Sequence, residues 1–176
     1  MHRMIRRPSV LAVAVVLAML LALPATATPR SERDAVRQVA SVEYLGEAIV
    51  PTGTLFAGTE IGGLSSITYD AARGVYHTLS DDQGNRNTGD PVRYYTVDID
   101  LRGGTLTSDD VTFVDVTQLY ESGKVPFAPG GLDPEGFALG RQGFFYMSSE
   151  GNILADPTID PFIRRYNRHG RMTADL

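Results

Sequence analysis

Several residue types are absent or scarce in this chain, and each absence narrows what the protein is. No cysteine occurs among the 176 residues, so no disulfide bond stabilises the fold, which must depend on its core or on bound ions. Lysine occurs once, as Lys124, and the 21 acidic side chains outnumber the 16 basic ones. Because a negatively charged surface repels nucleic acid and attracts cations, we expect no nucleic-acid partner.

The first 27 residues have the pattern of an export signal. Three arginines lie within the first seven residues, Val10 to Leu23 is an unbroken apolar run, and Ala25-Thr26-Ala27 is a small-residue cleavage pattern. These features predict a signal peptide over residues 1–27 and a secreted, extracellular protein with no stable membrane span after cleavage. The alternative is an uncleaved anchor, since the run is shorter than the ~20 residues that span a bilayer but is long enough to tether the chain.

The rest of the chain is patterned as strands and has no sustained 3.6-residue apolar period. Residues 28–41 are interpreted as a flexible lead-in and residues 42–176 as one domain. Arg93–Asp100 alternates in the manner of a half-buried strand, and residues 118–131, with Gly and Pro throughout, are predicted to be a loop. Strands are expected at Val42–Val50, Leu64–Tyr69, Val75–Ser80, Arg93–Asp100, Val111–Thr117, Glu135–Leu139, Phe144–Ser149 and Phe162–Asn167.

Two segments resemble each other, and their similarity determines the predicted architecture. Gly62–Asp82 and Leu132–Gly151 each contain two short strands joined by a turn, with Gly74 and Gly143 at matching places. Four short antiparallel strands, a loop and four more strands is the order of β-propeller blades, so we predict an all-β fold with about two four-stranded blades. Because closed propellers need roughly four to eight blades, the domain is predicted to be incomplete at its C-terminus. The alternative is a self-contained β-sandwich of eight or nine strands, in which the similarity of the two segments is accidental.

Acidic residues lie at the ends of both predicted hairpins. Since the strands of a hairpin run antiparallel, residues before the first strand and after the second meet at one edge of the sheet. Carboxylates crowded there repel each other unless a cation neutralises them, and calcium prefers such oxygen ligands. We predict a calcium site formed by Asp81, Asp82, Glu135 and Glu150, with Glu60 and Asp133 as reserve ligands. The alternative is that these are ordinary solvated turn residues.

Other catalytic patterns are weaker. Ser65 and Ser66 follow Gly62-Gly63-Leu64, which is not the G-x-S-x-G turn of a serine hydrolase, and no catalytic residue is assigned. His77 and His169, the histidines that follow the predicted signal peptide, are interpreted as structural or exposed. Arg93 opens a predicted strand near Asp81 and is the best candidate for contacting a substrate phosphate through its guanidinium group. Its alternative role is that of a solvated residue at a strand end.

Several ordered motifs together resemble a known family. They are E-I-G-G-L-S-S from Glu60, S-D-D at Ser80–Asp82, R-Y-Y at Arg93–Tyr95, P-F at Pro126-Phe127, D-P-E-G at Asp133–Gly136 and S-S-E-G at Ser148–Gly151. This set resembles the secreted phytase-like family labelled "esterase-like activity of phytase", over about Val42 to Leu176. Members of that family are about twice as long, which agrees with the prediction that further blades are missing.

The resemblance implies an exported β-propeller that hydrolyses phosphoric esters. In the better-understood β-propeller phytases, calcium ions in an acidic channel mouth bind the substrate phosphate and activate water, which is metal-assisted hydrolysis of a small-molecule substrate. No basic phosphate pocket is visible among these residues. Two other functions therefore stay open: a non-catalytic extracellular propeller that binds a ligand or partner, and a calcium-dependent lactone or carboxyl-ester hydrolase.

Overall fold

The computed structural model describes residues 39–84 and 89–176. The predicted signal peptide and nearly all of the predicted lead-in lie outside these residues. The chain divides into two units at Glu43 and Tyr44, and every strand belongs to the second unit, Tyr44–Leu176. Within the part of the chain that the structure describes, no helix has the length and apolar character needed to cross a membrane.

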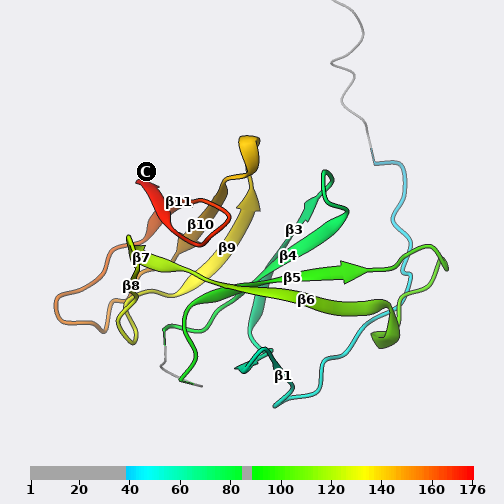
Figure 1. The fold of residues 1–176 in the computed structure, drawn as a ribbon, viewed down its shortest axis with the longest axis horizontal. Helices are drawn as coiled ribbons and strands as arrows, with labels where there is room; N and C mark the ends of the chain where they lie inside the picture. The colour runs from blue at the N-terminus through cyan, green and yellow to red at the C-terminus, as the bar shows by residue number, and fades with distance from the viewer. Residues whose placement is uncertain (1–38, 85–88) are drawn as a thin grey trace, which may run out of the picture. The chain divides into compact units, whose positions relative to one another are not determined.

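Two four-stranded antiparallel sheets form the second unit (Figure 1). Each sheet takes four strands consecutive in the sequence and keeps them in that order, the up-and-down order of a propeller blade rather than the strand exchange of a sandwich. The predicted all-β architecture of two four-stranded blades is confirmed. The first sheet contains β3 (Leu64–Asp70), β4 (Val75–Ser80), β5 (Arg93–Ile99) and β6 (Val111–Gln118), and the second contains β9 (Pro134–Leu139), β10 (Phe145–Ser149), β11 (Phe162–Tyr166) and β12 (Met172–Asp175).

Short elements connect and flank the sheets. They are the pair β1 (Leu55–Phe56) and β2 (Thr59–Glu60), the pair β7 (Tyr120–Ser122) and β8 (Val125–Pro126), and the 3-10 turns η2 (Ser108–Asp110) and η3 (Arg141–Gly143). In the first hairpin of each sheet, the turn ends on a glycine with positive φ, +70° at Gly74 and +75° at Gly143. This backbone conformation favours glycine, so the predicted internal repeat has a shared local cause.

The main hydrophobic core lies between the two sheets. Leu79 and Tyr94 of the first sheet are buried against Phe137 and Phe145 of the second, and the two phenylalanine rings stack with centroids 4.7 Å apart. Burial of each such side chain stabilises the fold by about 1.5–3 kcal/mol. Hydrogen bonds add to this contact between the sheets, since Leu139 N donates to Thr68 Oγ1 at 3.2 Å.

Strand β5 is buried on both faces, which corrects the prediction of a half-buried strand. Tyr94 packs in the core between the sheets, whereas Tyr95 and Val97 point the other way into a second core with Ile61 and Phe56. The segment that carries β1 and β2 covers this second face. Sequence alternation alone cannot detect a cover supplied by another segment, because aromatic and β-branched residues suit either situation.

Two other expectations were wrong. Val42–Val50 forms no strand, and Gly46, with a φ of +133°, makes a single parallel bridge to Leu106. The residues around it have strand-forming side chains, but Val42 and Tyr44 are exposed and no neighbouring strand pairs with this segment. Conversely, the predicted loop 118–131 contains the small hairpin β7–β8.

The turn that follows β11 docks directly onto the first sheet. Tyr120 N donates to the Gly170 carbonyl at 2.9 Å. Gly170 has a φ of +70°, and a methyl group in place of its hydrogen would overlap the carbonyl oxygen of Gln118. The contact therefore requires glycine twice, for the backbone conformation and for the close approach of two main chains.

Comparing alanine at Gly170 and at Gly74 separates these two requirements. Both glycines have a φ of +70°, but nothing lies within 4 Å of a side chain added at Gly74. Gly74→Ala is expected to cost about 1 kcal/mol from the backbone alone. Gly170→Ala is expected to cost a further ~1–3 kcal/mol from steric overlap. Urea denaturation measures both, and equal losses would show that the turn is not pressed against the first sheet.

Candidate functional site

The first acidic end forms where β3 begins and β4 ends. Asp81 N donates to the Gly63 carbonyl at 2.7 Å, and the Ser80 hydroxyl donates to the Gly62 carbonyl at 2.9 Å. Gly63 has a φ of +55°, and any side chain there would overlap the Asp81 carboxylate. The Gly-Gly pair before β3 thus gives the Asp81 carboxylate space directly over the main chain.

The second acidic end repeats this arrangement between β9 and β10. Glu150 N donates to the Asp133 carbonyl at 2.9 Å, and the Ser149 hydroxyl accepts from Asp133 N at 2.9 Å. Asp133 and Glu150 line a hollow of about 260 Å³ that Gln83 of the first sheet's end also lines. The prediction that each hairpin brings its own acidic residues to one edge therefore agrees with these contacts.

The two acidic ends are close enough to interact electrostatically. Burial raises the pKa of Asp81, and the carboxylates of Asp133 and Asp82 raise it further. Burial also raises the pKa of Glu135, followed by repulsion from Asp133, Glu150 and Asp81. Each raised pKa means that the folded protein disfavours the ionised form of that carboxyl group. We call the four carboxylates of Asp81, Asp133, Glu135 and Glu150 the acidic rim.

The acidic rim offers negative charge and oxygen donors, but its side chains do not form a ready-made metal site. Carboxylate and carbonyl oxygens are the ligands that calcium prefers, and water completes its coordination in many proteins. Among the residues that the structure describes, however, no three His, Cys, Asp or Glu side chains are grouped so as to hold a metal ion. A cation bound here would therefore need main-chain carbonyls or water in addition to carboxylates.

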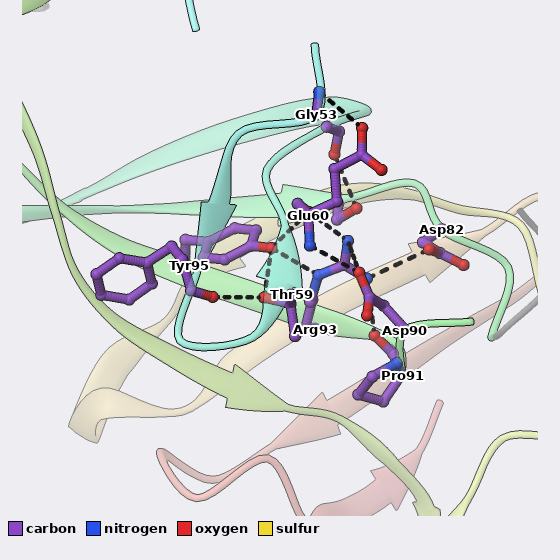
Figure 2. A network of polar contacts seen from close by, with 11 residues as sticks. Gly53, Thr59, Glu60, Asp82, Asp90, Pro91, Arg93 and Tyr95 are labelled. Carbon is purple, nitrogen blue, oxygen red and sulfur yellow. Dashed lines mark hydrogen bonds and ion pairs between the residues drawn. The ribbon is translucent and has the colours of Figure 1, made fainter. Parts of the chain in front are cut away.

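Asp82 and Glu60 have different surroundings from the rim, because both contact Arg93 (Figure 2). The Arg93 side chain is 1% exposed. Its Nη1 donates to Asp82 Oδ2 at 3.3 Å and to the Pro91 carbonyl at 3.0 Å. Its Nη2 donates to the Glu60 carbonyl at 2.7 Å and lies 3.5 Å from Asp90 Oδ2. Its Nε donates to Tyr95 Oη at 2.7 Å, which completes the contacts of the guanidinium group.

This network joins three segments that are separate in the sequence. Arg93 connects the end of β2, the residue pair after β4 and the start of β5. Asp90 Oδ2 also accepts from Glu60 N at 2.7 Å, so the guanidinium group and the carboxylate hold the main chain on both sides of the same residue. A guanidinium group has five N–H donors, and here its three nitrogens make four hydrogen bonds to oxygens of the protein and one further ion-pair contact with Asp90. The substrate-binding role of Arg93 stays a prediction, and its observed contacts are those of a residue that holds the chain together.

Sequence reasoning did not single out Asp90, Thr59 or Tyr95. The Tyr95 hydroxyl contacts Thr59 Oγ1 at 2.8 Å and donates to the Glu60 carbonyl at 2.7 Å. The Asp90 carboxylate reaches Arg93 and Glu60 from just before β5. Tyr95 belongs to the R-Y-Y motif, but neither that motif nor the sequence around Thr59 and Asp90 indicates these contacts, because they depend on where Arg93 lies in the fold.

A hollow of about 360 Å³ lies beside this network. It is lined by residues 60–63 and 80–82 together with Val50, Thr52 and Arg93. Asp81 therefore borders this hollow as well as belonging to the acidic rim. Of the six predicted ligands, the structure places four in the rim, buries Asp82 against Arg93, and directs Glu60 Oε1 to accept from Gly53 N at 3.1 Å.

Replacing Arg93 tests its structural role. Arg93→Met keeps an apolar, unbranched side chain but removes the guanidinium group that contacts Asp82 and Asp90, so we expect a loss of about 3–5 kcal/mol in the free energy of unfolding. Arg102→Met is the matched control, because Arg102 pairs with Asp100 but its side chain is 90% exposed, and its loss should leave stability nearly unchanged. Similar urea midpoints for the two variants would contradict the structural role.

Comparison with known proteins agrees with these observations on the fold. A search of the curated proteins and a search of the solved structures each found no match. The family model named Phytase-like, described as "Esterase-like activity of phytase", matches residues 59–176, which is more than half of the chain and includes β2 to β12 and the whole acidic rim. The family resemblance drawn from the motifs is thereby confirmed, and the chain belongs to the Phytase-like family.

Proposed function

We propose that this protein is an exported hydrolase of phosphate esters whose acidic rim binds calcium. The observation that carries the proposal is that the hairpin ends place carboxylates together: Asp133 and Glu150 line one hollow, and Asp81 N is bonded to the Gly63 carbonyl at the corresponding end of the first hairpin. In agreement with this placement, burial and then the neighbouring carboxylates raise the pKa of Asp81 and of Glu135. Carboxylates that repel one another in the folded state are stabilised by a cation between them. Membership of the Phytase-like family supports a small-molecule substrate and a hydrolytic reaction, and the pattern of residues 1–27 supports export.

The rim residues differ in what they would do. Asp133 and Glu150 would supply carboxylate oxygens to calcium from the hollow that they share, Asp81 would add negative charge nearby, and main-chain carbonyls and water would complete the coordination. Asp82 and Glu60 would support the site through Arg93. Bound calcium would attract a substrate phosphate and increase the acidity of water. Glu135 is exposed on β9, and its raised pKa makes its carboxylate a better proton acceptor for an attacking water than an ordinary glutamate.

A second candidate is a non-catalytic propeller that binds a ligand at the rim. The observation that favours it concerns Arg93, the best candidate from the sequence for contacting a substrate phosphate. Arg93 directs its hydrogen-bond donors to oxygens of the protein rather than toward a phosphate. A third candidate is a calcium-dependent hydrolase of lactones or carboxyl esters, which the words "Esterase-like activity" in the family description favour.

Calcium titration followed by thermal unfolding tests the proposed site. A ligand that binds only the folded state stabilises it by about 2.7 kcal/mol at one hundred times its Kd, so the unfolding midpoint should rise with calcium. Asp81→Asn should abolish most of this rise. Asp109→Asn is the control. Asp109 is exposed in η2, just before the start of β6, and that start pairs with Ile99 at the end of β5 opposite to Arg93. An unchanged midpoint in the unsubstituted protein would refute calcium binding.

The surroundings of Glu135 predict that the stability of the calcium-free protein, kept in a chelator, depends on pH. The pKa of Glu135 is raised in the folded state, so the folded protein binds more protons and loses stability as the pH rises through that pKa. Glu135→Gln removes this repulsion. We therefore expect the variant to unfold at a higher temperature than the unsubstituted protein at pH 7 without calcium, and at a similar temperature near pH 4. A lower midpoint at pH 7 would show that Glu135 is stabilised by its surroundings.

Activity assays separate the three functions. With calcium present, the unsubstituted chain should release phosphate from phytate and from an aryl phosphate, and Glu135→Gln should lose about 10²–10⁴-fold of that rate. Faster cleavage of an aryl carboxyl ester would favour the third candidate. No turnover of either ester class, in a protein that calcium stabilises, would favour the binding function.

A further inference from the structure

A second buried ionic cluster lies away from the acidic rim, at the other end of β3. Three basic side chains, two arginines and one histidine, converge on one oxygen, Asp70 Oδ2. Arg168 Nη1 is 2.9 Å from it, His77 Nε2 is 3.6 Å from it, and Arg73 Nε is 4.0 Å from it. Asp70 and His77 are each about 1% exposed. The proposed function uses none of these residues.

Arg168 reaches this oxygen from the second sheet. It belongs to the turn after β11, and its own carbonyl accepts from Tyr94 Oη at 3.1 Å. Its guanidinium group lies over the ring of Phe145, 5.9 Å from the centroid. It also passes so close to Gly143 that a side chain there would overlap it. The ion pair between Arg168 and Asp70 is therefore a specific polar link between the two sheets.

His77 lies behind this link with one ring nitrogen unsatisfied. Its Nδ1 is 3.1 Å from Thr96 Oγ1, whereas its Nε2 makes no hydrogen bond to any residue that the structure describes. The rings of Tyr94 and Phe145 meet it edge to face at 5.6 and 4.8 Å. The Nδ1–Thr96 contact allows either atom to donate, so either ring nitrogen can carry the proton of the neutral ring. A second proton gives both nitrogens an N–H group and gives the ring a positive charge.

The charges facing His77 come from every element around it. Burial is the largest influence and lowers its pKa below the ordinary value of 6.5; Asp70 on β3 opposes this, and Arg168 and Arg73 add to it. Tyr94 on β5 faces it as a phenol whose pKa burial raises. His77 is therefore neutral at neutral pH, and Arg168 is the cation that pairs with Asp70. Burial alone would raise the pKa of Asp70, but the contact with Arg168 holds it below its usual value.

We infer that His77 is an acid-sensitive latch: as the pH falls, a proton joining the buried ring places a new positive charge beside Arg168 and Arg73, which weakens the ion pair of Arg168 with Asp70 Oδ2 and loosens the turn that joins the sheets. One proton moves from solvent to the ring, no covalent bond between heavy atoms changes, and the Arg168–Asp70 ion pair is the contact that separates. The displaced guanidinium group can enter water, because the Arg168 side chain is already 30% exposed. Asp70 stays ionised in this range, since its own pKa is lowered.

The sign of the effect follows from the direction of the shift. A histidine with a lowered folded pKa leaves stability unchanged above its unfolded value of 6.5. Between that value and the folded pKa, the opening equilibrium should grow about tenfold for each unit by which the pH falls. Asp70 makes no contribution there, because its stabilisation is lost only at more acidic pH.

Backbone hydrogen exchange on the full chain tests the latch. The probe is the Tyr120 amide, which donates to Gly170 in the turn. After correction for the intrinsic exchange rate, its protection should fall about tenfold per pH unit below ~6.5 in the unsubstituted protein. It should be independent of pH between 5 and 7.5 in His77→Gln. The matched control is His169→Gln, which removes the exposed histidine of the same turn and should keep the unsubstituted response.

Arg168→Met provides an independent test should His77→Gln fail to fold. The Tyr120 amide of this variant should have low protection at pH 7.5 and at pH 5, because the ion pair between residue 168 and Asp70 is absent. Amides in the centre of β5 should remain protected. Constant protection at Tyr120 from pH 7.5 to 5 in the unsubstituted protein would overturn the inference. An unsubstituted pH response in His77→Gln, or its loss in His169→Gln, would overturn it as well.

Discussion

The buried guanidinium group of Arg93 is the interaction on which much of the first sheet depends. An arginine that is 1% exposed must have its charge compensated and its donors satisfied, because desolvation of an unpaired ion costs several kcal/mol. Asp82 and Asp90 supply the opposite charge, and Glu60, Pro91 and Tyr95 supply the remaining acceptors. The ends of β2, β4 and β5 are consequently held in one place, which is the place where the acidic residues also lie.

The same arrangement divides the acidic residues into two kinds. Asp82 faces the arginine, so its charge is compensated inside the protein. Asp81 lies over Gly63, and the carboxylates of Asp133 and Asp82 repel its charge more than Arg93 attracts it. The Arg93 network therefore neutralises Asp82 but leaves the carboxylates of the rim repelling one another. This repulsion is the physical basis for proposing a bound cation.

The two sheets are joined by contacts of contrasting kinds. Between them lies an apolar core of stacked and tilted rings, whose contribution depends on the area removed from water and changes little with pH. At the edge lies the polar cluster of Asp70, Arg168 and His77, whose contribution depends on charge. Placing an ionisable group at the edge of a large apolar contact allows the edge to respond to protons while the core persists.

The sequence predicted those features that have a local cause. Gly74 and Gly143 produce positive-φ turns, so the paired hairpins and the two blades were recognisable from their spacing. The family was also recognisable, since its motifs are short and ordered. The gathering of acidic residues at the ends of each hairpin followed from antiparallel pairing alone.

Only the tertiary structure decided which residues have which partners. Asp81 and Asp82 are neighbours of identical chemistry, and no pattern tells which one meets a buried arginine that arrives from another strand. The cover over the second face of β5, the failure of Val42–Val50 to pair and the convergence of Arg168 and His77 on Asp70 have the same origin. Local propensity determines where a strand can form, whereas charge compensation and burial depend on segments that meet only when the chain is folded.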